Sequence, residues 1–75
     1  MPTTYIRFSA KYLDGEWRKE TVNIGSYSEN RKYAKELVEM FRHFLYKGNL
    51  LGYTVELVTS TRNGEYTDII GTEEM

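Results

Sequence analysis

The sequence has no cysteine, one proline and one histidine among its 75 residues. Without cysteine there is no disulfide, no thiolate nucleophile and no sulfur ligand, and a single histidine cannot supply the ligand spacing of a zinc site. We therefore expect neither a metal nor a cofactor. A chain of this length has one small core and nothing that cross-links it, so pairing with another chain or with a second copy would add stability.

Long apolar runs are also missing from the sequence. No stretch approaches the roughly 20 apolar residues that a membrane span needs, and Met1-Pro2-Thr3-Thr4 does not begin a secretory signal. These features predict a cytoplasmic protein without a membrane partner. We expect one α+β domain over residues 1–75, ending in an acidic tail, residues 71–75, that is frayed.

The formal net charge is only −1, which disfavours a protein that binds nucleic acid by its overall charge. The charge is unevenly distributed, because residues 1–35 carry seven Lys and Arg against four Asp and Glu, whereas residues 36–75 carry three against seven. Such asymmetry can mark two binding faces or head-to-tail packing of copies. It can equally be ordinary solvated charge.

Residues 26–48 have the pattern of one amphipathic helix. A single apolar stripe is formed at helical spacing by Ala34, Leu37, Val38, Phe41, Phe44 and Leu45. The predicted N-cap is Ser26, with Glu29 completing a capping box, and Ser28 is an alternative. Gly48 suits the left-handed position that follows a helix. The stripe must pack on another element, while the charged remainder of the helix faces water.

Two strands are predicted before this helix, at residues 4–12 and 17–24, with a turn at Asp14-Gly15. A two-residue turn would place polar and apolar side chains on the same face. A three-residue loop with Gly15 in the left-handed position of a bulge instead sets Ile6 opposite Val22. We therefore expect the bulged hairpin.

Two further strands are predicted after the helix. Residues 53–60 alternate, and Asn63-Gly64 is a strong hairpin signal. A two-residue turn there opposes Leu57 with Ile70 on the inner face and Val58 with Ile69 on the outer face, whereas a bulged loop opposes Leu57 with Ile69. The order of elements predicts an α+β fold, ββαββ: a four-stranded antiparallel sheet with the amphipathic helix packed on one face. The strand order is left open.

The sequence offers little for catalysis. It has no phosphate-binding glycine loop and no carboxylate pair that stands apart from ordinary surface charge. The single histidine, His43, follows Glu39 by one helical turn, where such a pair is a common surface contact, and no group that would work with it as a catalytic base can be named. We predict that the protein is not an enzyme.

The sheet face turned away from the helix, here called the outer sheet face, carries rings and cations. Tyr, Trp and Arg are enriched at protein interfaces because they join a large apolar area to directed hydrogen bonds. We predict a small accessory or inhibitory module that binds a protein partner or a second copy stoichiometrically, a homodimer being one form. The candidate contact residues are Tyr5, Arg7, Lys11, Trp17, Lys19 and Val58.

Two other interpretations of the outer sheet face stay open. Aromatic and basic side chains can simply shield an open sheet. They can also stack on bases and contact phosphates, which makes a nucleic-acid-binding domain the alternative function. In addition, the two edge strands leave backbone groups to which a peptide or a second copy could add a strand.

The spacing of Trp17, Ile24-Gly25, Tyr27 and Ala34 resembles the sheet-then-helix segment of AP2-type and integrase arm-type DNA-binding domains. The likeness covers residues 5–45. It implies a sheet whose side chains enter the DNA major groove. Those domains place three strands before their helix, whereas this sequence predicts two.

Overall fold

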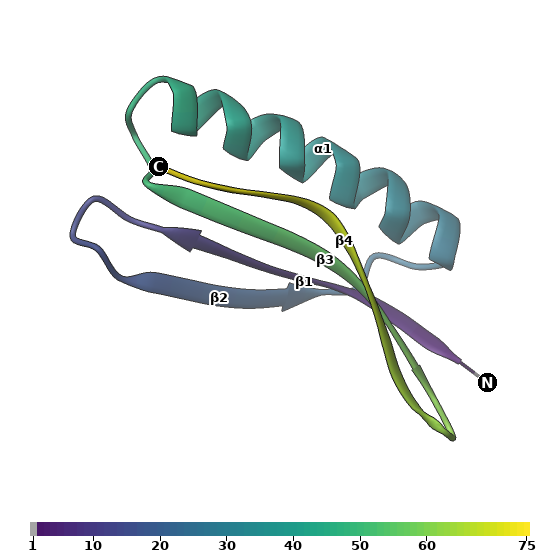
Figure 1. Cartoon of the computed structure of the whole chain (residues 1–75). Coiled ribbons are helices and arrows are strands. Elements are labelled where there is room, and N and C mark those ends of the chain that lie inside the picture. The colour runs from purple at the N-terminus through teal and green to yellow at the C-terminus, as the bar shows by residue number, and fades with distance from the viewer. Residues whose placement is uncertain (1) are drawn as a thin grey trace.

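The computed structural model describes residues 2–75, which form one antiparallel sheet and one helix (Figure 1). In chain order the elements are β1 (Thr3–Lys11), β2 (Trp17–Val22), α1 (Tyr27–Tyr46), β3 (Gly52–Thr61) and β4 (Gly64–Glu74). The strands lie in the order β2-β1-β3-β4, and all neighbours are antiparallel. The helix packs on one face, over β1, β3 and β4. The predicted α+β fold is confirmed.

The β1–β2 hairpin has the bulged loop that the sequence predicts. Gly15 N–H donates to the Tyr12 carbonyl at 2.9 Å, Tyr12 N–H donates to the Glu16 carbonyl at 2.9 Å, and Gly15 has a φ of +86°. Ile6 lies opposite Val22, as expected. The bulge keeps the apolar side chains of β1 and β2 on one face, which is why the parity of the sequence was sufficient to find it.

The β3–β4 hairpin turns one residue earlier than predicted. Thr61 pairs with Gly64, and the Thr61 hydroxyl closes the turn by accepting from Asn63 N–H at 3.2 Å and donating to the Gly64 carbonyl at 3.0 Å. Leu57 therefore lies opposite Asp68. Both predicted registers for this hairpin were wrong.

A bulge in β4 shifts the strand by one residue after this early turn, so that its apolar side chains return to the face that packs on the core. The register shifts between Val55 and Glu56, so that Val55 pairs with Gly71, Glu56 pairs with Ile69, and Ile70 is the extra residue. Ile70 packs against the core, while Ile69 is exposed. The two isoleucines thus face the sides that the two-residue turn predicts and not those of the bulged loop, although their partners differ from both.

The end of the chain is paired with the rest of the sheet. The β4 strand continues to Glu74, and Met75 N–H donates to the Leu51 carbonyl at 2.8 Å. The expectation of a frayed tail from Gly71 was wrong, since an acidic composition does not prevent backbone pairing. Gly71 also lies directly below the helix, where a Cβ would come within 2.8 Å of both methyl groups of Val38.

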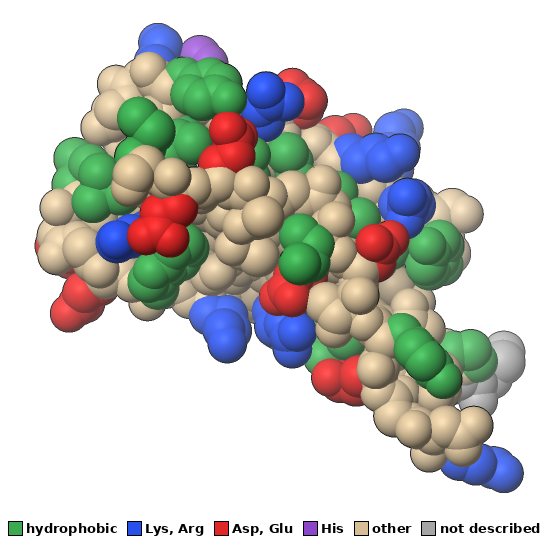
Figure 2. All heavy atoms as spheres, viewed as in Figure 1, with side chains coloured by type: hydrophobic (Ala, Val, Ile, Leu, Met, Phe, Trp, Pro, Cys, Tyr) green, Lys and Arg blue, Asp and Glu red, His purple; other side chains and the backbone are tan. Residues whose placement is uncertain are grey.

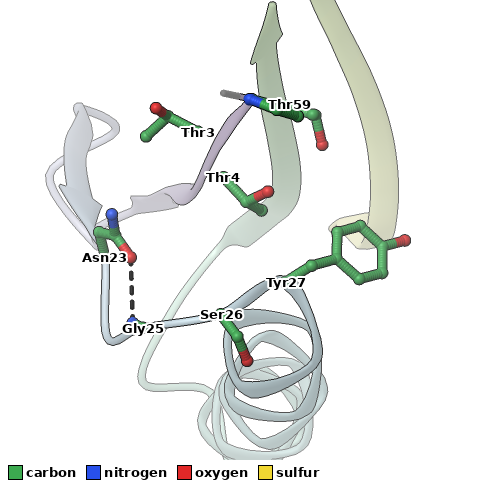
Figure 3. Close-up of a pocket in the computed structure, with 8 residues that line it drawn as sticks. Thr3, Thr4, Asn23, Gly25, Ser26, Tyr27 and Thr59 are labelled. Carbon is green, nitrogen blue, oxygen red and sulfur yellow. Dashed lines mark hydrogen bonds between the residues drawn. The ribbon is translucent and has the colours of Figure 1, made fainter.

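The start of α1 is fixed by the capping box that the sequence predicts. The Ser26 hydroxyl accepts from Glu29 N–H at 3.2 Å, and the Glu29 carboxylate accepts from Ser26 N–H at 3.0 Å, which lowers the pKa of Glu29. Before it, the Asn23 side chain accepts from Gly25 N–H (Figure 3). The hollow at this end of the helix is lined mainly by hydroxyl and amide side chains, among them Thr4, Asn23 and Ser26.

The core lies between the helix and the inner face of the sheet. It contains Ile6, Ala10, Ala34, Leu37, Phe41, Leu45, Tyr53, Val55 and Leu57. Val38 packs against its margin, and Phe44, predicted to belong to the stripe, is more than one third exposed. The fully buried Asn30 extends the stripe instead. Among residues 2–75, no helix is both long and apolar enough to cross a membrane.

The charge asymmetry of the sequence is largely neutralised inside the fold. Three ion pairs join a cation of the first half of the chain to a carboxylate of the second half: Arg7–Glu56, Lys11–Glu74 and Arg31–Asp68. In Figure 2 basic and acidic side chains lie scattered beside one another over the visible surface. The halves of the sequence therefore do not form two oppositely charged faces.

Candidate binding surface

The outer sheet face is left uncovered by α1, which packs on the opposite side (Figure 1). Strand alternation and the observed register place Tyr5, Arg7 and Lys11 of β1 and Trp17 and Lys19 of β2 on this face, as the sequence predicts. Glu56, which the sequence did not mark as a site residue, joins them from β3. Its position beside Arg7 depends on the pairing of β1 with β3.

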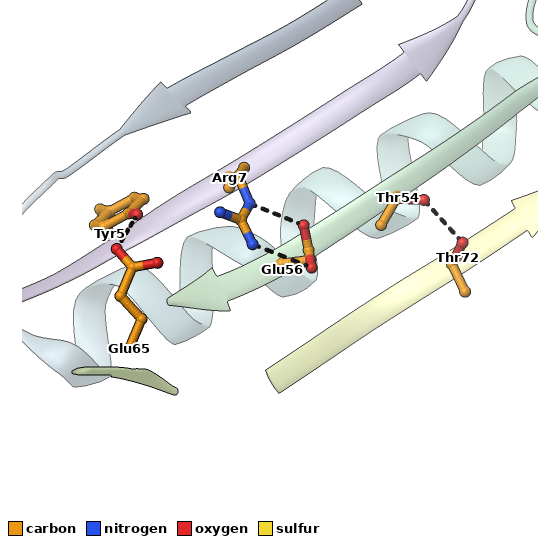
Figure 4. A network of polar contacts seen from close by, with 6 residues as sticks. All are labelled: Tyr5, Arg7, Thr54, Glu56, Glu65 and Thr72. Carbon is orange, nitrogen blue, oxygen red and sulfur yellow. Dashed lines mark hydrogen bonds and ion pairs between the residues drawn. The ribbon is translucent and has the colours of Figure 1, made fainter. Parts of the chain in front are cut away.

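Two of the predicted contact residues are held by carboxylates of the second hairpin (Figure 4). The Arg7 guanidinium donates to Glu56 through Nε at 3.0 Å and through Nη2 at 3.5 Å. The Tyr5 hydroxyl donates to Glu65 at 2.9 Å, and this hydrogen bond raises the pKa of Tyr5. Both side chains are half-buried and fixed in direction, which lowers the entropy lost when a partner binds.

The two lysines of the face differ. Lys11 Nζ lies 2.9 Å from Glu74 Oε2, at the edge where the chain ends. Lys19, by contrast, is exposed and makes no ion pair with any of residues 2–75. Lys19 is therefore the outer-face cation that is most available to an approaching carboxylate.

The Trp17 side chain reaches across β1 to the backbone of β3. Its Cη2 atom is 3.2 Å from the position that a Cβ on Gly52 would occupy, so glycine at that site leaves room for the indole. The side chain nevertheless stays 44% exposed. An indole that is supported from below and open above is the type of side chain that anchors protein interfaces.

An open depression of about 430 Å³ lies beside this indole. Ser9 and Thr54, which are directly paired across β1 and β3, are its small residues, while Trp17, Lys19 and Glu56 complete the lining. The Thr54 and Thr72 hydroxyls lie 2.9 Å apart next to it (Figure 4). The depression combines an aromatic wall, a cation, a carboxylate and hydroxyl groups. It can therefore accept a polar segment of another chain.

Val58 differs from the other predicted contact residues. It lies opposite Tyr5 in the outer register, yet it is 0% exposed. Sequence alternation correctly gave its face but could not show that neighbouring side chains cover it. Val58 supports the surface from within and does not itself offer a contact.

His43 lies on the exposed side of α1. The His43 ring packs edge-on against Phe44, with ring centroids 5.8 Å apart, and among residues 2–75 no ion pair joins it to Glu39. Among residues 2–75, no group of three His, Asp or Glu side chains could hold a metal ion.

A polar cluster that the sequence did not reveal lies between the end of α1 and β4. Glu73 accepts hydrogen bonds from the Tyr53 and Tyr46 hydroxyls, and the Arg42 guanidinium lies 3.3 Å away, which together lower the pKa of Glu73. Burial and the same hydrogen bond raise the pKa of Tyr53. The partners come from three elements, so no local motif could indicate them. The cluster ties the helix to the sheet.

Comparisons with protein-family models, with curated proteins and with solved structures find no match for this chain. Two strands, not three, precede the helix, so the arrangement differs from that of the AP2-type and integrase arm-type domains that the sequence resembles.

Proposed function

We propose that this protein is a small non-enzymatic module that binds a protein partner stoichiometrically through its outer sheet face. The observation that supports the proposal best is the half-exposed Trp17 beside an open depression with Lys19 and Glu56 in its lining. A supported aromatic anchor next to a few polar groups is the common arrangement of an interface centre. The fixed positions of Tyr5 and Arg7 favour binding without reorganisation.

The charge pattern favours a protein partner over nucleic acid. Arg7 and Lys11 are each bonded to a carboxylate of the same face, so a phosphate would have to displace Glu56 or Glu74 and would meet their repulsion. Affinity for nucleic acid depends mainly on cations that neutralise several phosphates. A face of mixed charge fits a partner that presents an acidic group to Lys19 and apolar surface to Trp17.

The test is affinity capture from a lysate of the cells that make the protein, treated with nuclease, followed by mass spectrometry. Three baits are compared: the natural protein, Trp17→Ala, and Tyr66→Ala as the matched control. Tyr66 is also an exposed aromatic residue, but it pairs with Thr59 and so lies on the other face of the sheet. We expect a partner that is retained by the natural protein and by Tyr66→Ala and is lost from Trp17→Ala. A partner that Trp17→Ala retains equally would refute the proposed surface.

Binding of labelled single- and double-stranded DNA and RNA, measured by fluorescence anisotropy at low salt, tests the alternative function. The proposal predicts no measurable binding. Tight binding that weakens steeply with salt, and that Arg7→Ala and Lys19→Ala reduce together, would show that the outer sheet face recognises nucleic acid instead.

A further inference from the structure

The β2 strand is an edge strand that the rest of the fold leaves bare on both faces. The helix packs on β1, β3 and β4 and does not reach β2. Residues 17–21 are all exposed, and only Val22 is half-buried. The strand has no proline, no glycine and no bulge in its pairing with β1. Its only protection is therefore its short length and the charges of Arg18, Lys19 and Glu20, which leave the backbone ladder itself uninterrupted.

The backbone of β2 has free groups at regular intervals along its outer edge. Tyr12 N–H donates to the Glu16 carbonyl, so the antiparallel alternation turns the backbone groups of Arg18, Glu20 and Val22 toward β1. The N–H and C=O groups of the alternate residues of the strand point away from the sheet. These residues are Trp17, Lys19 and Thr21.

The other edge of the sheet is protected. The β4 strand contains a bulge at Ile70, and a bulge bends a strand and interrupts a regular ladder. Its carboxylates are bonded within the molecule, Asp68 to Arg31 and Glu73 to Arg42, by guanidinium groups that extend from the helix. An added strand would therefore pair with β2 more readily than with β4.

We propose that β2 pairs antiparallel with β2 of a second copy, which joins two four-stranded sheets into one of eight strands. The two-fold axis would pass between the two Lys19 residues. Trp17 would then lie opposite Thr21 of the second copy, and Arg18 opposite Glu20. This inference does not depend on the proposed function, because it rests on the backbone edge of β2, although Trp17 and Lys19 also belong to the outer sheet face.

Charge complementarity favours this register, in which Arg18, bonded to Asp14 of its own hairpin at 3.4 Å, gains a second carboxylate. Antiparallel pairing keeps each side chain on its own face of the sheet, so a shift must move the strands by two residues. A shift one way places Arg18 opposite itself, and the other way places Glu20 opposite itself. The proposed register instead forms two Arg18–Glu20 pairs at non-hydrogen-bonded positions, where cross-strand side chains are closest. Its unfavourable contact is Lys19 opposite Lys19, on the solvent-exposed outer face.

An exposed apolar flank of α1 borders the same edge. Tyr33, Met40 and Phe44 are 37%, 44% and 37% exposed, and their spacing places them on one side of the helix. Arg31 and Arg42 reach β4 from the opposite side, so this flank faces β2. The helix does not reach β2, so pairing leaves this flank open, facing the same flank of the second copy across the two β2 strands.

Analytical ultracentrifugation over a concentration series from micromolar to millimolar tests the proposal. We expect the natural protein to approach twice its mass of 8.9 kDa as concentration rises. Thr21→Pro removes an N–H that points outward and leaves the β1–β2 ladder intact, so it should give a folded monomer. Asn63→Pro would not be a matched control, because Asn63 N–H is bonded to Thr61. Thr21→Val is the matched control, because it keeps the backbone N–H and should still dimerise.

The register is tested by charge reversal. Arg18→Glu and Glu20→Arg alone each oppose like charges twice per dimer, and each should raise the dissociation constant by roughly a factor of ten or more. The double change Arg18→Glu, Glu20→Arg restores complementary pairs and should restore the dimer. Lys19→Thr removes the repulsion at the axis and should tighten association. Circular dichroism of every variant checks that the chain is folded.

Three outcomes would overturn the inference: a natural protein that stays at 8.9 kDa throughout, a dimer that folded Thr21→Pro leaves unchanged, or charge reversals whose combination recovers nothing. Arg18 and Glu20 do not line the depression beside Trp17. Loss of the dimer in their variants is therefore distinguishable from loss of partner binding in Trp17→Ala.

Discussion

Asn30 is the residue at which three segments of the fold meet. Its side-chain amide donates to the Thr4 carbonyl at 3.2 Å and to the Gly25 carbonyl at 3.2 Å, and its oxygen accepts from Ile24 N–H at 3.0 Å. It thus joins the helix to β1 and to the loop that follows β2. Helical periodicity alone presents position 30 as a polar interruption at the end of the apolar stripe, and nothing in the sequence shows which backbone groups it satisfies.

Replacing Asn30 with alanine should destabilise the protein strongly. The variant would leave buried backbone groups without partners, and we expect the free energy of unfolding to fall by roughly 2–4 kcal/mol. Urea denaturation followed by circular dichroism measures the change. Asn63→Ala is the control, because Asn63 lies exposed in the β3–β4 turn and should change stability by less than about 0.5 kcal/mol. Equal effects of the two substitutions would contradict this role.

Glu73 gives the stability of the protein a defined dependence on pH. Its pKa is lowered by the hydrogen bonds from Tyr53 and Tyr46, and Arg42 adds to the effect. The folded state therefore binds a proton at Glu73 less readily than the unfolded chain does. The stabilisation is complete above the ordinary glutamate pKa of about 4.3 and is lost as the pH falls through the lowered value.

The variant Glu73→Gln should show a weaker loss of stability on acidification. We expect the free energy of unfolding of the natural protein to decrease more than that of the variant between roughly pH 6 and pH 3. Glu29, whose pKa is also lowered, contributes equally to both proteins. Glu36→Gln, a change at an exposed helical position, serves as the control and should follow the natural protein. Parallel curves for all three proteins would refute the assignment.

At the scale of elements, the contact between α1 and β4 depends on the absence of a side chain at Gly71. A Cβ there would lie 2.8 Å from both Cγ atoms of Val38, and a β-branched side chain cannot easily rotate away. Gly71→Ala should therefore lower the free energy of unfolding by roughly 1–3 kcal/mol. The double variant Gly71→Ala, Val38→Ala should be more stable than the sum of the single effects predicts. Additive effects in chemical denaturation would show that no clash exists.

The two hairpins show how far the sequence could predict the elements. The first has apolar residues at clear alternation on both strands, so only a bulged loop keeps them on one face, and its register was predicted correctly. The second has the run Ile69-Ile70, which satisfies either parity. The Thr61 hydroxyl fixes the position of its turn, and a bulge decides which of the two isoleucines faces the core. Neither feature has a strong signal in the sequence.

At the scale of the whole molecule, the candidate surface depends on strand order. The sequence predicts that Tyr5, Arg7 and Trp17 share a face, because alternation along the first hairpin is sufficient for that. It cannot show that β1 lies beside β3, and this neighbour brings Glu56 to Arg7. Pairing across the halves of the chain converts an apparent basic region into a surface of mixed charge. The balance between a protein and a nucleic-acid partner changes with it.

If two copies share one eight-stranded sheet, thermal stability must depend on protein concentration. Unfolding then includes dissociation, so mass action favours the native dimer as the concentration rises. Above the dissociation constant, a tenfold increase should raise the melting temperature by roughly 3–6 °C for a dimer of this size. Thr21→Pro, which keeps the hairpin but blocks the edge, should melt at a temperature independent of concentration. Differential scanning calorimetry of both proteins decides the matter: a melting temperature of the natural protein that stays constant over the series would show that each copy is stable alone.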